Sequence, residues 1–308
     1  ILLKGIVFAN IVQFGGGLFV DSQNAKDLGM GGYSVSMASG ANPTLLINAN
    51  KSELHFSYKD KFHGLSRVKT ISYLHCKLED EIKSPIFVSI VKRSVSDIPD
   101  TRRALESGNY PEPSNINYLN ISNISHNELG LKVSLLRQYN LFLLGFSFKA
   151  IYNKLAEYKA LGFSADVGGA ITVSDNINFS IRMMDALSYK KWNTDSHEIN
   201  TPIIIVGSKF TFTTLLFGFE IKTPISNTNL IDYNAGIEYY LKDRFVILRA
   251  GISRNLLFSV GIGLDLKSLF LDYAYLQTSP VMPFNASQIF SIGFPIESLY
   301  QIKEKIIP

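Results

Sequence analysis

Short segments in which apolar residues alternate with small or polar residues dominate this sequence. In 256–266 the two sets are Phe258, Val260, Ile262 and Leu264 on one side and Ser259, Gly261, Gly263 and Asp265 on the other. The same pattern recurs in 140–153, 214–223 and 287–295. Successive side chains of a β-strand point to opposite faces of the sheet. Each segment is therefore predicted to form a strand with one apolar face and one small or polar face.

Fourteen such segments follow one another from about residue 52, separated by polar turns such as Lys242-Asp243 and Arg254-Asn255. They cover 52–59, 66–77, 85–94, 124–137, 140–153, 157–173, 176–188, 201–213, 214–223, 230–241, 243–253, 256–266, 268–278 and 287–295. Most are long enough to cross a bilayer as tilted strands, which takes about 9–11 residues. An even strand number is typical of closed single-chain bacterial barrels.

Composition favours a membrane barrel over a soluble sheet protein. The chain has 308 residues, of which 46% are hydrophobic and only 18% charged. Its mean hydropathy is +0.12, yet no apolar run in the body of the chain reaches the ~18 residues of a membrane-spanning helix. The fold class predicted is all-β: a transmembrane antiparallel β-barrel of about 14 strands. A net charge of +4 is too small to indicate a nucleic-acid partner.

The segment Ala25–Asn50 fits neither a helix nor a strand, because it has three glycines within four residues and then an Asn-Pro turn. The polar faces of the strands are unusually rich in glycine and serine, which suits a lumen wall against which another segment packs. We therefore expect this segment to form a hatch that plugs the barrel. Its predicted key residues are Gly29, Met30, Gly31, Gly32, Asn42 and Pro43.

The order of motifs resembles the PorV/PorQ-like branch of the FadL-related outer-membrane barrels. The amino-terminal motifs are Leu28-Gly29-Met30-Gly31-Gly32 and Asn42-Pro43-Thr44, where Thr44 replaces the usual alanine. Further motifs are Asp97–Thr101, Ala235–Tyr239, Val246–Gly251, Gly261–Leu264 and Leu271–Tyr275. The resemblance covers about Ala25 to Pro295. It implies a bacterial outer-membrane location, with membrane lipid as one partner.

The predicted organisation has four parts. Residues 1–17, with Lys4 before an apolar run and three glycines, are expected to be the remainder of a secretory signal peptide, with a first strand or hatch segment as the alternative. Residues 18–51 form the hatch, 52–295 the transmembrane barrel and 296–308 a carboxyl-terminal tail.

Two functions follow from the resemblance. In the first, the protein is a non-enzymatic component of type IX secretion that binds exported cargo or caps a translocon, so its partners are proteins. In the second, it is a FadL-like, hatch-gated channel that takes up hydrophobic small molecules and releases them sideways. The inward positions identified in the strands are small and polar, which favours the protein-interaction function.

Three charged residues lie in otherwise apolar strands: Glu238, Arg249 and Asp272. Alternation points each of them away from the apolar face, and a basic residue facing lipid at mid-membrane would cost roughly 2–4 kcal/mol. We therefore expect a lumenal charge network with an arginine between two carboxylates. It could act as a gate or hatch latch, or simply pin the wall to the hatch.

Two long loops are predicted. Ser94–Ser122 is too long for a periplasmic turn, and we place it outside the cell, where a partner could contact Pro99, Arg102, Arg103 and Tyr110. Asp185–Pro202, which contains Trp192 and His197, is the second.

No catalytic or metal-binding pattern is present. The five histidines are scattered without metal-ligand spacing, and there is no nucleophile elbow or phosphate-binding loop. The single cysteine, Cys76, can form no internal disulfide and is expected to pack within a strand. We predict neither enzymatic activity nor a cofactor.

Overall fold

The computed structural model describes residues 17–20, 23–33, 42–49, 51–76, 78–79, 82–105, 116–174, 176–226, 228, 230–241, 245–253, 257–277 and 286–298. Residues 1–16 of the predicted signal segment and residues 299–308 of the tail lie outside these ranges. None of the described helices is long and apolar enough to span a membrane.

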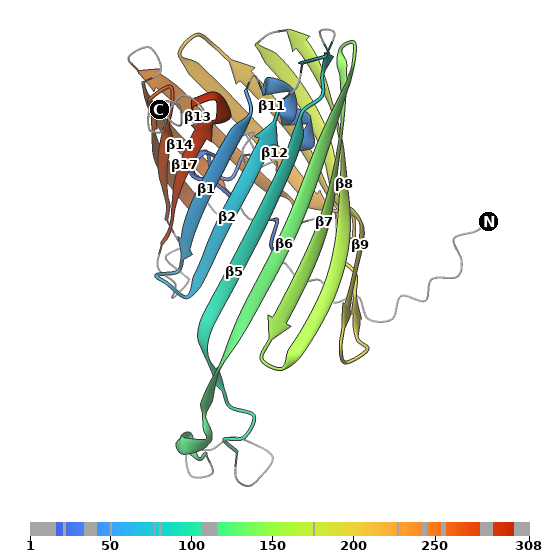
Figure 1. The fold of residues 1–308 in the computed structure, drawn as a ribbon, viewed down its shortest axis with the longest axis vertical. Helices are drawn as coiled ribbons and strands as arrows, with labels where there is room; N and C mark the ends of the chain where they lie inside the picture. Colours follow the sequence, from blue (N-terminus) through green and yellow to red (C-terminus); the bar gives the residue numbers. More distant parts are fainter. Residues whose placement is uncertain are drawn as a thin grey trace, which may run out of the picture.

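Fourteen antiparallel strands of the described chain form one closed barrel (Figure 1). Each strand pairs with its neighbours in the sequence, β17 pairs with β1, and β8 pairs with β9 to complete the cylinder. The strands are β1 (Glu53–Lys61), β2 (Ser66–His75), β5 (Ile86–Asp100), β6 (Ser122–Tyr139), β7 (Phe142–Leu155), β8 (Tyr158–Ser174), β9 (Ile177–Trp192), β11 (Ile203–Thr211), β12 (Leu215–Pro224), β13 (Asp232–Leu241), β14 (Val246–Ser253), β15 (Leu257–Asp265), β16 (Phe270–Leu276) and β17 (Ser287–Pro295). All fourteen predicted strands are confirmed.

Alternation separates the two faces of the wall as predicted. In β15 the side chains of Phe258 and Val260 are each 56% exposed, whereas Ser259 between them is only 2% exposed. The same contrast holds for Phe146 and Phe148 against Ser147 in β7. Because the sheet is closed, the buried polar set faces the lumen and the exposed apolar set faces outward. An apolar outer surface on a closed barrel is the surface that a lipid bilayer covers.

The two ends of the barrel differ. At the turn end, strands are joined by tight turns such as 140–141, 212–214 and 266–269, and both the start of β1 and the end of β17 lie there. At the loop end, the connections include 101–121, 193–202 and 225–231. Figure 1 shows β5 and β6 running together well beyond the other strands at the loop end. Short periplasmic turns and longer extracellular loops are the usual arrangement.

The predicted loops are shorter than the sequence indicated. β5 continues to Asp100 because a register shift between Val95 and Ile98 absorbs residues that break the alternation, and Asp97 there has a φ of +57°. Likewise β9 does not end before Asp185 but runs to Trp192, and the two-residue strand β10 (His197–Glu198) pairs with its end. In each strand a bulge interrupts the two-residue alternation, so the sequence pattern did not predict the extension.

One seam of the wall is incomplete. β9 pairs with β11 only from Ile177 to Met184. Beyond Met184 it bulges, with a shifted register opposite Ala165 and Val167 of β8, and Asp185 takes a left-handed φ of +52°. Along 185–189 its free side is joined to the chain after β10 by side-chain bonds at Ser188, described below.

Candidate functional site

The lumen is filled by the first described segments of the chain. The short helix α1 (Ala25–Gly29) begins at Asn24, whose side chain accepts a hydrogen bond from the Asp27 N–H (2.9 Å). It packs against β14, β15, β16 and β17. The wall holds it by its backbone: the Ala25 N–H donates to Ser291 Oγ (3.0 Å), and the Ser259 hydroxyl donates to the Gly29 carbonyl (3.1 Å). Side chains add to this attachment, since Ala25 and Leu28 pack against Ala274 of β16 and Ile289 of β17.

After α1 the chain approaches the wall backbone to backbone. Gly31 has a φ of +73°, and its N–H donates to Ser259 Oγ (2.9 Å). A Cβ at Gly251 would lie only 2.0 Å from the Gly31 nitrogen, and one at Gly236 would lie 2.5 Å from the Met30 oxygen. The wall glycines are therefore the places where the plug lies closest, as the glycine-rich polar faces had predicted.

The remaining residues of this run are held in the same region. Met30 is fully buried and packs with Tyr33 and Leu216. The Gly32 carbonyl accepts a hydrogen bond from Asn234 Nδ2 (2.9 Å). The Tyr33 ring lies over Gly218, where a Cβ would be 2.2 Å away. Together, Gly218, Gly236, Gly251 and Gly261 on β12–β15 define what we call the glycine side of the lumen.

A second plug element lies near the turn end. The 3₁₀ helix η2 (Pro43–Asn48) is capped by Asn42, whose side chain accepts a hydrogen bond from the Thr44 N–H (3.2 Å). Pro43 is fully buried against Gly145, where a Cβ would be 2.8 Å away. All six predicted hatch residues thus lie on the inner face of the wall.

The lumen has a second, apolar side that the sequence analysis did not expect. Its inward residues come from β2, β5, β6 and β7 and are Val68, Leu74, Phe87, Val91, Leu136 and Leu143. Leu46 of η2 packs among the residues nearer the turn end, and Leu18 and Phe19 pack against Val68 and Val91. The inward positions identified from the sequence, such as Ser147 and Ser259, are small or polar and buried. The sequence analysis did not identify these apolar inward positions, which apolar plug residues cover.

The predicted lumenal charge network is assembled on the glycine side. Arg249 Nε donates to Glu238, and its Nη1 donates to Asp272 Oδ1 (2.7 Å). All three are buried. Gly29 of α1 lies over the Arg249 side chain, since a Cβ at Gly29 would be 3.3 Å from Arg249 Cβ. The network thus joins three wall strands directly beneath the plug.

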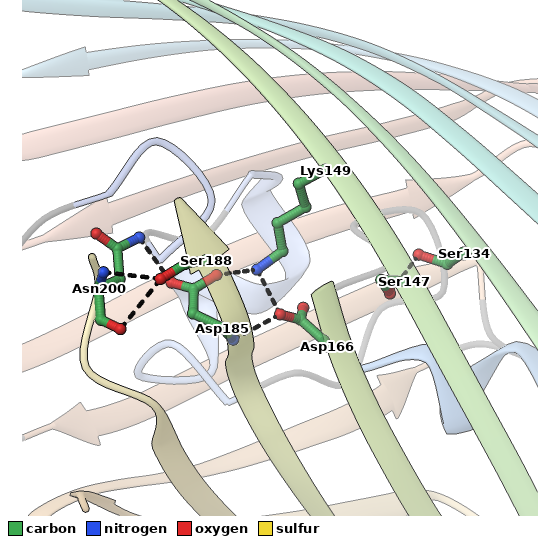
Figure 2. A network of polar contacts seen from close by, with 7 residues as sticks. All are labelled: Ser134, Ser147, Lys149, Asp166, Asp185, Ser188 and Asn200. Atoms are coloured by element: carbon green, nitrogen blue, oxygen red, sulfur yellow. Dashed lines mark hydrogen bonds and ion pairs between the residues drawn. The ribbon is translucent and has the colours of Figure 1, made fainter. Parts of the chain in front are cut away.

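A second buried network lies on the opposite part of the wall, and the sequence analysis did not find it (Figure 2). Lys149 of β7 donates to Asp166 Oδ1 of β8 (2.5 Å) and to Asp185 Oδ1 of β9 (2.9 Å). Asn200 completes it, donating through Nδ2 to Asp185 Oδ2 (3.2 Å) and through its N–H to Ser188 Oγ (2.8 Å). This network spans the incomplete seam.

A small pocket separates η2 from the wall. Leu45, Ile47 and Leu143 form apolar walls, and Tyr33 and Lys209 bring polar groups to it. It lies where both plug elements and β11 meet, so the plug leaves some free space inside the barrel.

The predicted partner loop is partly described. Arg102 donates to both carboxylate oxygens of Asp100 (2.9 and 2.7 Å) and to Glu157 Oε1 in the β7–β8 turn (2.8 Å). These bonds lower the pKa of Asp100 to about 2. Pro99 pairs with Asn123 of β6, and Arg103 is exposed. Tyr110 lies outside the described residues.

Within the described ranges, no three His, Cys, Asp or Glu side chains gather to hold a metal ion. Cys76 is half-buried at the end of β2, and its thiol donates to the Ala49 carbonyl (3.3 Å).

The fold and the filled lumen together define a transmembrane β-barrel of the bacterial outer membrane whose interior is occupied by its own amino-terminal segments. No protein-family model matches the sequence, and no curated protein matches it.

Solved structures do resemble it. The Pseudomonas putida toluene transporter TodX aligns with a TM-score of 0.58 at 11% identity, over 89% of this chain and 97% of that one. The Ralstonia pickettii toluene transporter TbuX gives 0.59 at 8%, over 90% and 99%. A Pseudomonas aeruginosa FadL homologue gives 0.56 at 12%, over 91% and 100%. The chain therefore has the fold of FadL-type barrels. The finer resemblance to PorV/PorQ stays a prediction.

Proposed function

We propose that this protein is a plugged channel for small hydrophobic molecules. The observation that carries the proposal is the apolar side of the lumen, which is covered by Leu18, Phe19 and Leu46 of the plug rather than by polar groups. A barrel that only presented its loops to other proteins would have no need of an apolar interior surface. Two structural neighbours, TodX and TbuX, are toluene transporters, which supports the same substrate class.

The apolar side explains how the plug acts as a gate. Leu46 of η2 and Phe87 of β5 are fully buried in the same apolar cluster. Each buried aliphatic or aromatic side chain contributes about 1.5–3 kcal/mol by leaving water. An apolar solute that enters from the loop end can replace these contacts with its own. Plug displacement on this side then uncovers two apolar clusters on the wall, one around Leu74 and Phe87 and one around Val68 and Val91.

Exit sideways has a structural counterpart in the incomplete seam between β9 and β11. Beyond Met184 the two strands share no ladder hydrogen bonds, and the contact passes through Asp185, Ser188 and Asn200. A wall held there by side chains separates at lower cost than one held by a full ladder.

A disulfide lock tests the gate. The Cys76 thiol lies 3.3 Å from the carbonyl oxygen of Ala49, the residue that follows η2, so the variant Ala49→Cys should form a disulfide with Cys76 that ties η2 to the wall. We expect the oxidised barrel in liposomes to pass a small apolar fluorophore no faster than protein-free liposomes, and the reduced barrel to regain the flux of the unaltered protein.

The unaltered protein and the variant Ala49→Cys/Cys76→Ser each have one cysteine and serve as controls, since oxidation should not change their flux. Equal flux through oxidised and reduced Ala49→Cys would contradict the proposal that plug movement opens the channel.

A second candidate is the PorV/PorQ-type role in type IX secretion, and one observation favours it. The β5–β6 hairpin carries the 3₁₀ helix η4 (Tyr118–Asn120) at its far end, with Leu119 94% exposed. An exposed apolar tip on a projecting hairpin suits contact with a translocon or an exported cargo protein. Affinity purification from outer membranes should then recover a protein partner that Leu119→Asp loses. The channel proposal expects no such partner.

A further inference from the structure

The outer surface of the barrel carries a row of positive charges where apolar residues are expected. Arg67 and Lys69 of β2, Lys92 of β5, Lys154 of β7 and Lys159 of β8 all alternate with buried inward residues and are exposed. They therefore face outward. Basic residues on the lipid face cost roughly 2–4 kcal/mol at the midplane and much less near the interface. The cost of these five residues therefore depends on their depth in the membrane.

The strand register puts these residues on two neighbouring levels near the loop end, with Arg67, Lys154 and Lys159 two residues nearer that end than Lys69 and Lys92. Lys69 lies opposite Tyr58 of β1 on one side and Lys92 on the other. Across Leu129, the same level reaches Tyr152 of β7. Outward tyrosines mark the aromatic girdle at a membrane–water interface. Towards the turn end, the next outward residues on β2 and β5 are Ile71 and Ile90, so the charges sit at the upper edge of the apolar band.

Within this row the lysines face one another. Lys69 pairs directly with Lys92, and Lys154 pairs directly with Lys159. Directly opposed side chains on one face have Cβ atoms about 4.5–5.5 Å apart, and like charges so placed are destabilising. Snorkelling of single lysines to water would explain isolated charges, but it does not explain two opposed pairs on adjacent parts of the same wall.

The carboxylates beside the row are too few to balance its positive charge. None of the five cations forms a side-chain ion pair within the described chain. Asp60 is the carboxylate opposite Arg67 in the register, and its Oδ1 accepts a hydrogen bond from the Gly64 N–H (2.5 Å). Glu157, in the turn between Lys154 and Lys159, is bonded to Arg102. The five cations therefore outnumber the carboxylates beside them, and an anion from outside the protein can bind the row.

From this arrangement we propose that the outward row Arg67, Lys69, Lys92, Lys154 and Lys159 binds the phosphate groups of a phosphorylated glycolipid in the outer leaflet. The opposed lysine pairs supply several donors to one phosphate, and the row extends across strands β2 to β8, far enough for a headgroup with more than one phosphate. The outward residues nearer the turn end, such as Ile71, Ile90 and Leu131, contact its acyl chains. The inference holds whether the barrel transports solutes or binds proteins.

The test is binding of purified lipid A to the detergent-solubilised barrel, followed by native mass spectrometry. Each basic residue near an anionic lipid surface contributes enough for about a fivefold change in affinity, so Lys69→Gln/Lys92→Gln should weaken binding roughly 25-fold. Lys69→Arg/Lys92→Arg should retain it. Arg137→Gln removes an exposed cation at the turn end and is the matched control, expected to change nothing.

Two further arms decide the source of the anion. Removing the phosphates from lipid A should weaken its binding to the unaltered protein at least as much as Lys69→Gln/Lys92→Gln weakens the binding of intact lipid A. Phosphatidylglycerol should bind more weakly than lipid A. Equal binding of either lipid, or unchanged lipid A binding by the double glutamine variant, would overturn the proposal. Folding is monitored without lipid, where removal of the opposed charges should leave the melting temperature unchanged or higher.

Discussion

The glycine side and the apolar side of the lumen hold the same plug in different ways. On the glycine side, the plug backbone contacts the wall backbone at Gly31 and Gly251. Hydrogen bonds to Ser259 and Ser291 fix the position of the plug there. On the apolar side, Leu18, Phe19 and Leu46 pack in apolar clusters, with the Lys149 ammonium 6.0 Å from the centre of the Phe19 ring. Hydrogen bonds and close backbone contact demand one geometry, whereas apolar packing is non-directional.

The difference indicates which part of the plug moves. A segment that leaves the glycine side loses several directional contacts at once, and no apolar solute can replace them. A segment that leaves the apolar side loses contacts that a hydrophobic solute supplies equally well. We therefore infer that α1 is the anchor of the plug and that η2 and residues 18–19 are the movable part.

The largest effect is expected from Arg249→Met, which leaves Glu238 and Asp272 buried without their cation. Removing one partner of a buried ion network typically costs about 3–5 kcal/mol, and here it should destabilise both the wall and the anchor above it. Thermal unfolding in detergent measures the loss. The Glu238→Gln/Arg249→Met/Asp272→Asn variant should recover most of it, and failure to do so would mean that the arginine acts by packing alone.

Leu46→Ala should come next and should act on the apolar side alone. Truncation of a buried leucine costs about 2–5 kcal/mol, but this cost should appear as loosening of η2 rather than as barrel unfolding. We expect faster flux of an apolar fluorophore with little change in the melting temperature of the barrel. Leu119→Ala, at a 94% exposed site, is the control. An unchanged flux for Leu46→Ala would remove the distinction between the two sides.

Gly251→Ala tests the anchor directly. The new Cβ would lie 2.0 Å from the Gly31 nitrogen, so α1 must shift, with an overpacking cost of about 1–3 kcal/mol. Limited proteolysis should then cut the plug faster. Gly169→Ala, where the nearest atom to an added Cβ is 3.9 Å away, should behave like the unaltered protein. Similar proteolysis of both variants would show that backbone contact at Gly251 does not hold the plug.

The smallest effect concerns the loop end, outside both sides of the lumen. The pKa of Asp100 in the folded protein is about 2, below the ordinary value of about 3.9. Its contribution is therefore complete above about pH 4 and is lost as the pH falls towards 2. The β5–β6 hairpin should become more sensitive to pepsin over that interval, and Arg102→Ala should show the same sensitivity already at its upper end.

Local alternation was sufficient to predict most of the architecture. The fourteen strands, the lipid-facing surface and the meeting of Glu238, Arg249 and Asp272 follow from side-chain direction plus the pairing of neighbouring strands. The glycine-rich inward faces likewise indicated where a plug would lie. Each of these features depends on residues close in sequence or on adjacent strands in simple register.

Features that depend on irregular backbone could not be predicted in this way. Lys149 and Asp166 are inward polar residues on adjacent strands, so their pairing had a visible signal. Asp185 had no such signal, because its left-handed φ and the bulge in β9 remove it from the two-residue alternation of the strand. The apolar side was also missed, because inward leucines such as Leu74 and Leu136 lie near strand ends, where alternation alone assigns no environment.

The incomplete seam has a mechanical consequence. The first and last strands of the barrel, β1 and β17, meet through an unbroken register from Glu53–Pro295 to Asp60–Gln288. The closing strands thus pair along almost the whole of β1, whereas β9 has no ladder pairing to β11 beyond Met184, beside Asp185. Under lateral tension from the bilayer, the wall should separate first between β9 and β11. Backbone amide hydrogens beside that opening should exchange with solvent before those between β1 and β17.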